Sequence, residues 1–489
     1  MRLDAGESTG SAPRDHGALP DWGSADLPAP APFTPANVAR AIGPGIIGLG
    51  LAIGGGEWLL GPAVIVNYGA VLLWITTIAV VCQVLLNSEM ARYTLATGEP
   101  IVTGFMRTRP GPGFWGTWYG ACGFLQFGWP GWALASATAS AALMLGRVPT
   151  ADDAALVRLL GYGTFALCFV ITLVSRKVER AIERVMWVMV GGIIAYLVAL
   201  DVATVEAANW RKVASGFLSV GTVPEGVDWL LLGAFAAYSG LGGMGNAFIT
   251  NWMRDKGHGM SSTVGYIASA RAEQIPLSAQ GNRFPITGAS LTAWKAWWKF
   301  VHVDQVLIFG VGSLVGMALT SVLTLQFVPE GTATGGWAVA NMQAEAIAAV
   351  HGRFFWYLTV VCGFWVLFST QLGVVDGVPR SATDMLWSGS PAVRRWSGGD
   401  VRKVYYTALA AFAVWGGLAL NLAQPLTLIV ISANIGGVVM VCLSLHTIVV
   451  NRRFLPAELR APLWREAALV LTAAFYGLFA VMAALVTLG

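Results

Sequence analysis

A carboxylate that directly follows three glycines is the most chemically informative feature of this sequence. Gly54, Gly55 and Gly56 precede Glu57 inside an otherwise apolar stretch. Glycine is poorly suited to a helix interior, so the triplet predicts a break that leaves backbone carbonyls and amides free to contact a substrate. Glu57 would then lie at the start of the next half-helix, where the helix dipole stabilises negative charge. It could bind a cation, carry a proton, or serve only as a helix cap.

A second glycine-rich interruption lies at Tyr238–Asn246, again near the centre of an apolar run. Its sequence is YSGLGGMGN. Unpaired backbone amides and carbonyls are strongly unfavourable in lipid, so irregular backbone persists only where protein or water satisfies it. Both interruptions therefore predict places where a helix departs from regular geometry to contact something polar.

The composition indicates a protein with many membrane-spanning helices. Hydrophobic residues make up 56% of the 489 residues and charged residues only 11%, against roughly 25% charged residues in soluble proteins. Apolar runs long enough to cross a bilayer recur along the chain. Residues 1–37 are rich in Ala, Pro, Gly and Asp, and we expect them to form a disordered cytoplasmic tail. The five cysteines form no CxxC pair, so they predict neither a zinc site nor a disulfide framework.

The hydropathy pattern predicts eleven membrane-spanning helices within residues 38–489. Their ranges are 39–67, 70–96, 115–146, 156–175, 184–206, 228–253, 298–326, 353–377, 403–421, 425–450 and 464–488. Lys and Arg are concentrated in alternate loops. The other loops hold only Arg147, Arg158, Arg211, Lys212 and Arg353. The positive-inside rule therefore predicts a multi-pass protein of the cell membrane with a cytoplasmic N-terminus and an extracytoplasmic C-terminus.

The positions of the two interruptions predict internal symmetry. They fall in the first helix of each of two five-helix halves, about residues 38–206 and 228–450, with an extra helix at about 464–488. Interruptions at corresponding places are the best sequence pointer to an inverted-repeat transporter whose substrate binds near the bilayer midplane. We therefore expect an all-α, five-plus-five fold with discontinuous helices 1 and 6.

Several segments of the chain resemble the Nramp divalent-metal transporters. They are GPGIIGLGLAIGGGEW, NSEMARYTLATGEPI, VHVDQVLIF, LFSTQLGVVDGVPRSATDML and VISANIGGVVMVCLSLHTIVVNRRFL, which resemble that family's helices 1, 2, 7, 8 and 10 in order. The resemblance spans about residues 38–455. It implies the fold of the amino-acid/polyamine/cation transporter superfamily, with alternating access at the membrane midplane.

The metal-binding positions of that family carry different residues here. Counting from the opening Gly-Pro-Gly, the family's metal-binding Asp falls on Gly54 and its Asn on Glu57. In helix 6, aligning the last residue of the family's Met-Pro-His-Asn on Asn246 puts Gly243 at the Met position, although a one-residue slip would return Met244. The acids and the arginine of the family's proton route are also replaced.

The resemblance implies a substrate site with an altered set of ligands. Its expected members are Gly54, Gly55, Gly56, Glu57, Gly243, Met244 and Asn246. A thioether ligand would favour softer transition ions. If Met244 is not a ligand, Glu57, Asn246 and backbone carbonyls would form an all-oxygen site that suits a hard ion such as Mg²⁺. The predicted metal ligands are therefore Glu57 and Asn246.

Other polar side chains inside apolar runs are candidates for a pathway or a gate. They are Gln126, Tyr238, Asp304, Gln371, Asp376 and Asn434. Structural explanations compete with this role. Asp376 precedes Arg380 by four residues and could simply pair with it, and Asp304 could cap a helix. The long connector 254–297 could form a gate or contact a partner.

The leading functional interpretation is a transporter of a small cation, namely a divalent metal ion such as Mg²⁺ or Mn²⁺, by alternating access at helices 1 and 6. The alternative is a small organic solute, such as an amino acid or amine, held by the amides of Gly54–Gly56. The expected partners are the lipid bilayer and the transported species, with no nucleic acid, no obligatory protein partner and no cofactor. We expect no enzymatic activity, because the sequence has no nucleophile elbow, phosphate loop in context or metal-ligand spacing.

Overall fold

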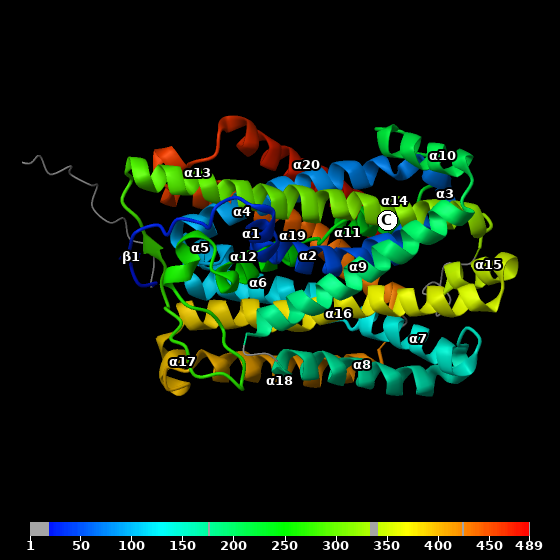
Figure 1. Cartoon of the computed structure of the whole chain (residues 1–489), viewed down its shortest axis with the longest axis horizontal. Helices are drawn as coiled ribbons and strands as arrows, with labels where there is room; N and C mark the ends of the chain where they lie inside the picture. The colour runs from blue at the N-terminus through cyan, green and yellow to red at the C-terminus, as the bar shows by residue number, and fades with distance from the viewer. Residues whose placement is uncertain (1–18, 175–176, 333–340, 423–424, 489) are drawn as a thin grey trace, which may run out of the picture.

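Helices run side by side along the long axis of the computed structural model (Figure 1), which describes residues 19–174, 177–332, 341–422 and 425–488. The elements up to residue 218 are β1 (Gly23–Ser24), α1 (Pro35–Ala41), α2 (Pro44–Ala52), η1 (Ile53–Leu60), α3 (Gly61–Tyr68), η2 (Gly69–Leu72), α4 (Trp74–Thr97), α5 (Ile101–Met106), α6 (Pro112–Phe127), α7 (Gly131–Leu145), η3 (Ala151–Asp153), α8 (Ala154–Val174), α9 (Val178–Thr204) and α10 (Ala207–Leu218).

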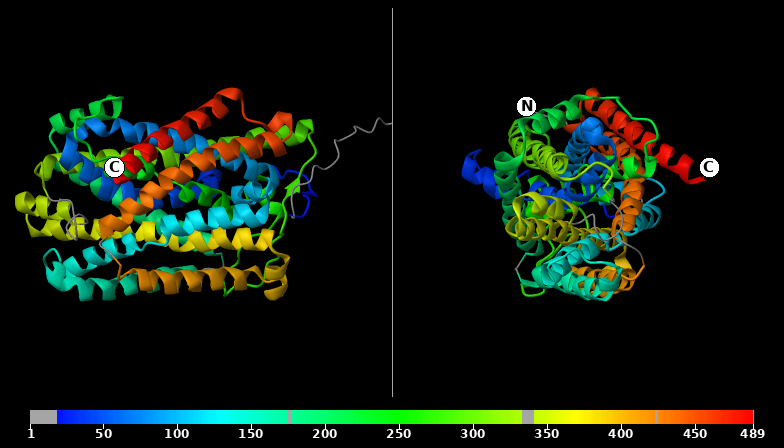
Figure 2. Two further views of the ribbon diagram at one scale, coloured as in Figure 1. Left: turned by 180° about the vertical axis from the view of Figure 1, so that it is seen from behind. Right: turned by 90° about the vertical axis from the view of Figure 1, so that its right-hand side faces the viewer.

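The remaining elements are α11 (Trp229–Tyr238), α12 (Met244–Lys256), η4 (Gly259–Thr263), β2 (Asn282–Arg283), α13 (Gly288–His302), η5 (Val303–Val311), α14 (Gly312–Phe327), α15 (Met342–His351), α16 (Arg353–Gly389), α17 (Pro391–Trp396), α18 (Val401–Ala419), α19 (Pro425–Phe454), η6 (Ala457–Leu459) and α20 (Leu463–Leu488). In two opposite views, α8 and α18 lie along one side of the bundle, away from α20 (Figures 1 and 2).

The predicted multi-span helical fold is confirmed. Eight of the described helices are long and apolar enough to cross a membrane. The other three predicted spans correspond to α6 with α7, α11 with α12, and α18. The predicted span 353–377 is too short, because α16 continues to Gly389.

Helix 6 is interrupted as predicted. α11 ends at Tyr238 and α12 begins at Met244, and the residues between them are not helical. Gly240, Gly242 and Gly243 have φ angles of 138°, 63° and 45°. These angles lie in the left-handed region that favours glycine, so the glycines are what permit the interruption.

Helix 1 departs from regular geometry at the predicted place but does not unwind. Residues 44–68 stay helical, and Gly54–Gly56 lie within the π-helical segment η1. In a π-helix each amide bonds to the carbonyl five residues earlier, as Gly61 N–H does to the carbonyl of Gly56. The expectation that the glycines free their amides and carbonyls by unwinding is therefore wrong. A paired backbone avoids the penalty of unsatisfied groups within a bilayer.

A third interruption, which was not predicted, divides helix 3 at Gly128–Pro130 between α6 and α7. Pro130 has no amide hydrogen to donate and disfavours a helical residue before it. The carbonyl of Gly128 accepts a hydrogen bond from the indole of Trp415 at 2.7 Å. The sequence FGWPGW contains the signal for this break.

The N-terminal segment is more ordered than predicted. The predicted disorder of residues 1–18 lies outside the described residues, but Leu19 and Leu27 are buried against the bundle, while residues 31–36 are exposed. β1 pairs in parallel with β2. The Trp22 ring lies 4.0 Å from the guanidinium of Arg107 and 3.7 Å from that of Arg283. These cation–π contacts and the strand pairing give a Pro-rich segment the tertiary partners that its composition alone does not reveal.

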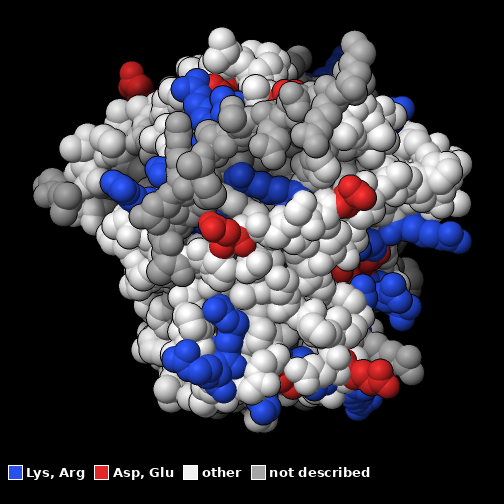
Figure 3. Space-filling view, turned by 90° about the vertical axis from the view of Figure 1, so that its left-hand side faces the viewer, with Lys and Arg blue, Asp and Glu red and all other residues white. Residues whose placement is uncertain are grey.

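Basic side chains gather at the end of the bundle that carries β1, α13 and α17, which we call the basic end (Figure 3). Part of the connector 254–297 also lies there, since it contains β2. The indole of Trp387 donates to the carbonyl of Leu277 in this connector at 3.0 Å, and Arg402 donates to that of Ala272 at 2.6 Å. A cytoplasmic location for the basic end remains a prediction of the positive-inside rule.

Lowering the pH is expected to destabilise the protein through His258, which follows α12. Its Nε2 lies 3.0 Å from the carbonyl of Ala41, and burial, assisted by the positive charge of Lys256, lowers the pKa of His258 from 6.5 to about 4. His258 is therefore protonated below about pH 6.5 in the unfolded chain, but only below about pH 4 in the folded chain. The free energy of unfolding should fall by about 2 kcal/mol between about pH 7 and about pH 5.

Unfolding of the purified protein in detergent, followed at both pH values, measures this effect. His258→Gln should reduce the pH dependence, whereas His351→Gln, at an exposed histidine, should leave it unchanged. Equal pH dependence in the wild type and in His258→Gln would contradict the assignment.

Candidate functional site

The π-helical segment of helix 1 lies directly against the interruption of helix 6. A Cβ atom added to Gly56 would collide with the backbone carbonyl of Tyr238. One added to Gly55 would lie 3.3 Å from the Tyr238 ring and 3.1 Å from Nε1 of Trp132, and one added to Gly54 would collide with the Thr370 hydroxyl of α16. The three glycines therefore allow helix 1 to pack closely against α7, α11 and α16.

Two glutamines satisfy the buried, non-helical backbone of the helix 6 interruption. Gln83 of α4 accepts from the amides of Leu241 and Gly242 at 2.7 and 3.1 Å. Gln126 of α6 accepts from the amide of Met244 at 2.9 Å and donates to the carbonyl of Gly242 at 3.1 Å. Gln126 thus supports the irregular backbone, and of its two predicted explanations the geometry favours bonding between helices over lining a pathway.

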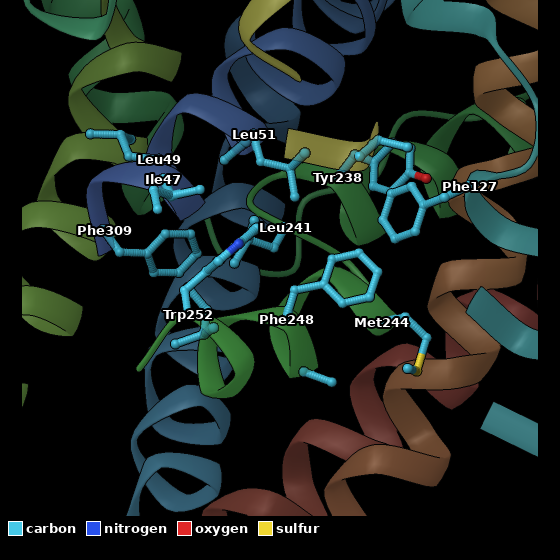
Figure 4. Packing of buried hydrophobic residues seen from close by; sticks show 14 of the residues in the cluster. Ile47, Leu49, Leu51, Phe127, Tyr238, Leu241, Met244, Phe248, Trp252 and Phe309 are labelled. Atoms are coloured by element: carbon cyan, nitrogen blue, oxygen red, sulfur yellow. The ribbon is translucent and has the colours of Figure 1, made fainter. Parts of the chain in front are cut away.

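Aromatic side chains pack tightly around the interruption (Figure 4). The rings of Phe127 and Tyr238 are stacked with centroids 6.5 Å apart, and the Phe127 ring lies 5.5 Å from that of Phe248. The Tyr238 hydroxyl bonds to that of Ser432 on α19. Tyr238, a predicted pathway residue, is therefore buried and held by helix 10 in this conformation.

Glu57 is fully buried, and neither of its carboxylate oxygens has a hydrogen-bond partner among the described residues. Its Cγ would lie 3.6 Å from a Cβ added to Gly316, which places the side chain against α14, the second part of helix 7. Ser313 lies one turn before Gly316, and its buried hydroxyl is also without a described partner. An unpaired carboxylate in such surroundings is unfavourable unless a proton or a cation neutralises it.

The side chains of the other two non-glycine members of the predicted site turn elsewhere. Met244 lies beside α6, with its Cγ 3.8 Å from a Cβ added to Gly123, and Figure 4 shows its side chain directed away from Leu51 of helix 1. Asn246 donates to the sulfur of Met440 on α19 at 3.2 Å, and its Oδ1 has no partner among the described residues. Because Glu57 packs on helix 7 and Asn246 on helix 10, the predicted pair of metal ligands contacts different helices here.

Comparison with solved structures identifies the architecture that surrounds this site. Two variants of the manganese transporter of Eremococcus coleocola each have a TM-score of 0.64 at 13% identity, with 94% of this chain and 89% of that chain covered. The chain has an inverted-repeat transporter fold. Mhp1, a nucleobase-cation-symport-1 family transporter, has a TM-score of 0.50 at 14% identity over 93% of both chains. No protein-family model and no curated protein matches the sequence.

The transporter fold contains a buried ionic cluster between α12 and α16. Arg380 donates to both carboxylate oxygens of Asp376 at 2.8 and 2.7 Å, and it also binds Asp255. Tyr405 and the indole of Trp252 donate to Asp376 at 2.7 and 2.8 Å. The predicted i,i+4 pair is present, and Asp376 is saturated with partners, which favours the structural explanation for it.

This cluster extends along α12 to a second pair. Arg254 donates to Asp384 at 2.7 and 3.1 Å and also binds Asp255. Asn251 donates to Asp384 at 2.5 Å. Since all of these side chains are buried, they join the second half of helix 6 to helix 8 through charges that are largely shielded from solvent.

The remaining candidates from the sequence act as backbone partners within the transporter fold. Asp304 accepts from the amides of Gly43 and Gly45 at 3.2 and 2.9 Å, so it caps the start of helix 1 as one alternative predicted. Gln371 accepts from the amide of Ala133 at 3.0 Å, in the first turn after the helix 3 interruption. Asn434 donates to the carbonyl of Leu230 at 2.9 Å.

One buried and unpartnered acidic residue was not among the candidates predicted from the sequence. Asp201, in the last turn of α9, is fully buried, and neither carboxylate oxygen has a partner among the described residues. Among the described acidic residues, only Glu57 and Asp201 share this property. The available signal was a lone acid inside the predicted span 184–206, which should have been treated as a functional candidate.

Proposed function

We propose that this protein transports a small, hard cation, such as Mg²⁺ or Mn²⁺, and binds it at Glu57. The observation that carries the proposal is the burial of an unpartnered carboxylate inside the π-helical segment of helix 1. π-Helical segments are frequent at functional sites. A cation would supply the missing opposite charge.

The donors near Glu57 favour a hard ion. Ser313 and Thr320 share a face of α14 with Gly316, which meets Glu57. The Ser313 hydroxyl has no partner among the described residues, whereas the Thr320 hydroxyl donates to the carbonyls of Gly316 and Met317 and keeps its oxygen as an acceptor. Oxygen donors of this kind suit Mg²⁺ and related ions. The Met244 thioether, the soft ligand that the sequence left open, packs on α6 instead. The manganese transporters among the similar structures support a metal ion as cargo.

The organic-solute alternative is less well supported by the packing. Because a single added carbon would collide at both Gly54 and Gly56, helix 1 would have to move away from α11 and α16 before an amino acid could bind between them. A feature that favours the alternative is the buried indole N–H of Trp132 beside Gly55, which has no partner among the described residues and could donate to a carboxylate.

Uptake into liposomes tests the proposal directly. The purified full-length protein is reconstituted, and accumulation of Mg²⁺, Mn²⁺ and Ca²⁺ is compared with that of a panel of amino acids and amines, using protein-free liposomes as the blank. We expect saturable metal uptake and no saturable uptake of the organic solutes. Saturable amino-acid or amine uptake without metal flux, lost in Trp132→Phe, would replace the proposal by the alternative.

A further inference from the structure

An open groove lies between α6 and α19 on the outer surface of the bundle, near the basic end. Its volume is about 500 Å³. It begins at Arg109 in the turn before α6 and extends past Trp118 towards Leu445 and Val449 of α19, with Arg453 at the other side of its mouth. None of the residues assigned to the transport site lines it.

The walls of the groove are apolar and face outward. Trp118, Leu445 and Val449 retain 41%, 44% and 49% of their accessible surface. On a bundle that crosses a membrane, such exposed apolar surface along two spanning helices contacts lipid chains. Tryptophan near a helix end is also typical of the level at which lipid headgroups lie.

The mouth of the groove carries two unpaired positive charges. Arg109 and Arg453 are both exposed, and neither forms an ion pair with a carboxylate of the described residues. The neighbouring Arg452, in contrast, binds Glu466. Two free guanidinium groups above an apolar wall would attract an anionic headgroup whose tails lie in the membrane.

The floor of the groove carries no acidic side chain among the described residues, and its histidine is bonded at both ring nitrogens. Nε2 of His446 lies 2.8 Å from the hydroxyl of Thr108, and Nδ1 lies 2.9 Å from that of Tyr119. The imidazole also stacks on Phe105 with a centroid distance of 4.4 Å. The groove is therefore preformed, and it offers no negative charge at its floor that would repel an anion.

We propose that this groove binds an anionic phospholipid. The phosphate lies between Arg109 and Arg453, and the upper part of one acyl chain lies along Trp118, Leu445 and Val449. The same two helices support the transport site, because Gln126 of α6 and Ser432 of α19 contact the interruption of helix 6 and its neighbour Tyr238. Lipid bound here is therefore expected to stabilise that arrangement.

The test compares lipids on the purified full-length protein in detergent. Thermal unfolding and native mass spectrometry are recorded with phosphatidylglycerol, with phosphatidylcholine and with inorganic phosphate. We expect phosphatidylglycerol to raise the unfolding temperature and to remain bound, and the other two to have little effect. Equal stabilisation by phosphatidylcholine would show that the negative charge of the headgroup is not recognised. Equal stabilisation by inorganic phosphate would show that the acyl chain does not contribute. Either result would overturn the proposal.

Two double variants locate the site. Arg109→Gln/Arg453→Gln should weaken phosphatidylglycerol binding roughly 30-fold, because each arginine near an anionic lipid surface contributes about a fivefold effect. Arg180→Gln/Arg395→Gln removes two exposed arginines elsewhere and should retain wild-type binding. Equal loss in both variants would show non-specific charge attraction, and no loss in the first would place the lipid elsewhere. If the first variant fails to fold, Leu445→Glu, which puts a negative charge on the lipid-facing wall, should give the same loss.

Discussion

Glu57→Gln is expected to lower cation uptake about 100-fold or more while leaving the protein folded. The substitution keeps the size of the side chain but removes the charge that would hold the ion. Loss of a charged partner in a buried site costs about 3 kcal/mol or more, which corresponds to this factor. Because the Glu57 carboxylate has no hydrogen-bond partner among the described residues, no folded-state interaction is lost with it.

Stability and transport should therefore respond in opposite ways to this substitution. The unfolding temperature of Glu57→Gln should equal or exceed that of the wild type, since the variant no longer buries an uncompensated acid. Glu57→Asp, which keeps the charge but shortens the side chain by one methylene group, should retain part of the uptake. Glu225→Gln, at an exposed acid, is the matched control and should behave as the wild type. Wild-type metal uptake by Glu57→Gln would exclude this residue as a ligand.

Arg380→Met is expected to destabilise the protein by about 3–5 kcal/mol. Arg380 is fully buried and binds Asp376 and Asp255. Removing one partner of a buried ion pair leaves uncompensated charge, which is far more unfavourable than the net contribution of the intact pair. The loss falls on the contact between α12 and α16, so the second half of helix 6 should separate from helix 8 more easily.

A matched pair of surface residues provides the control for Arg380. Arg147 binds Asp153 through the same type of bond at 2.6 Å, but the Arg147 side chain is half exposed, so Arg147→Met should change stability by about 1 kcal/mol or less. A double-mutant cycle of Arg380→Met with Asp376→Asn, followed by unfolding, measures the coupling between the partners. A destabilisation by Arg380→Met no larger than that of Arg147→Met would show that the buried cluster does not hold the two helices together.

The i,i+4 pair of Asp376 and Arg380 could be predicted from the sequence, because both residues lie on one helix. Spacing along one helix was enough to place the two side chains together, and the structure confirms their bond. The same reasoning could not supply Asp255, because it lies on another helix and 125 residues away. Likewise, the glycines at 54–56 correctly predicted an irregular segment, but the choice between unwinding and a π-helix depended on what packs against it.

The predicted site residues differ in the same way. Glu57 could be selected from sequence because a lone acid in an apolar run is exceptional, whereas Asn246 and Met244 were selected by their position in the chain, and their side chains turn towards α19 and α6. Asp201 was overlooked near the end of a predicted span, where an acid usually meets water, and its burial became evident only from the packed structure.

The sequence by itself determined that this chain crosses the membrane many times in two similar halves, and that its first and sixth spans are irregular at their glycines. These properties are local, because the length of an apolar run and the tolerance of glycine for unusual backbone angles depend on neighbouring residues. Only the tertiary structure decided that helix 1 stays hydrogen-bonded, that Trp22 and strand β1 find partners in the bundle, and which acids keep a partner. Those outcomes depend on side chains from distant segments, which meet only when the helices pack.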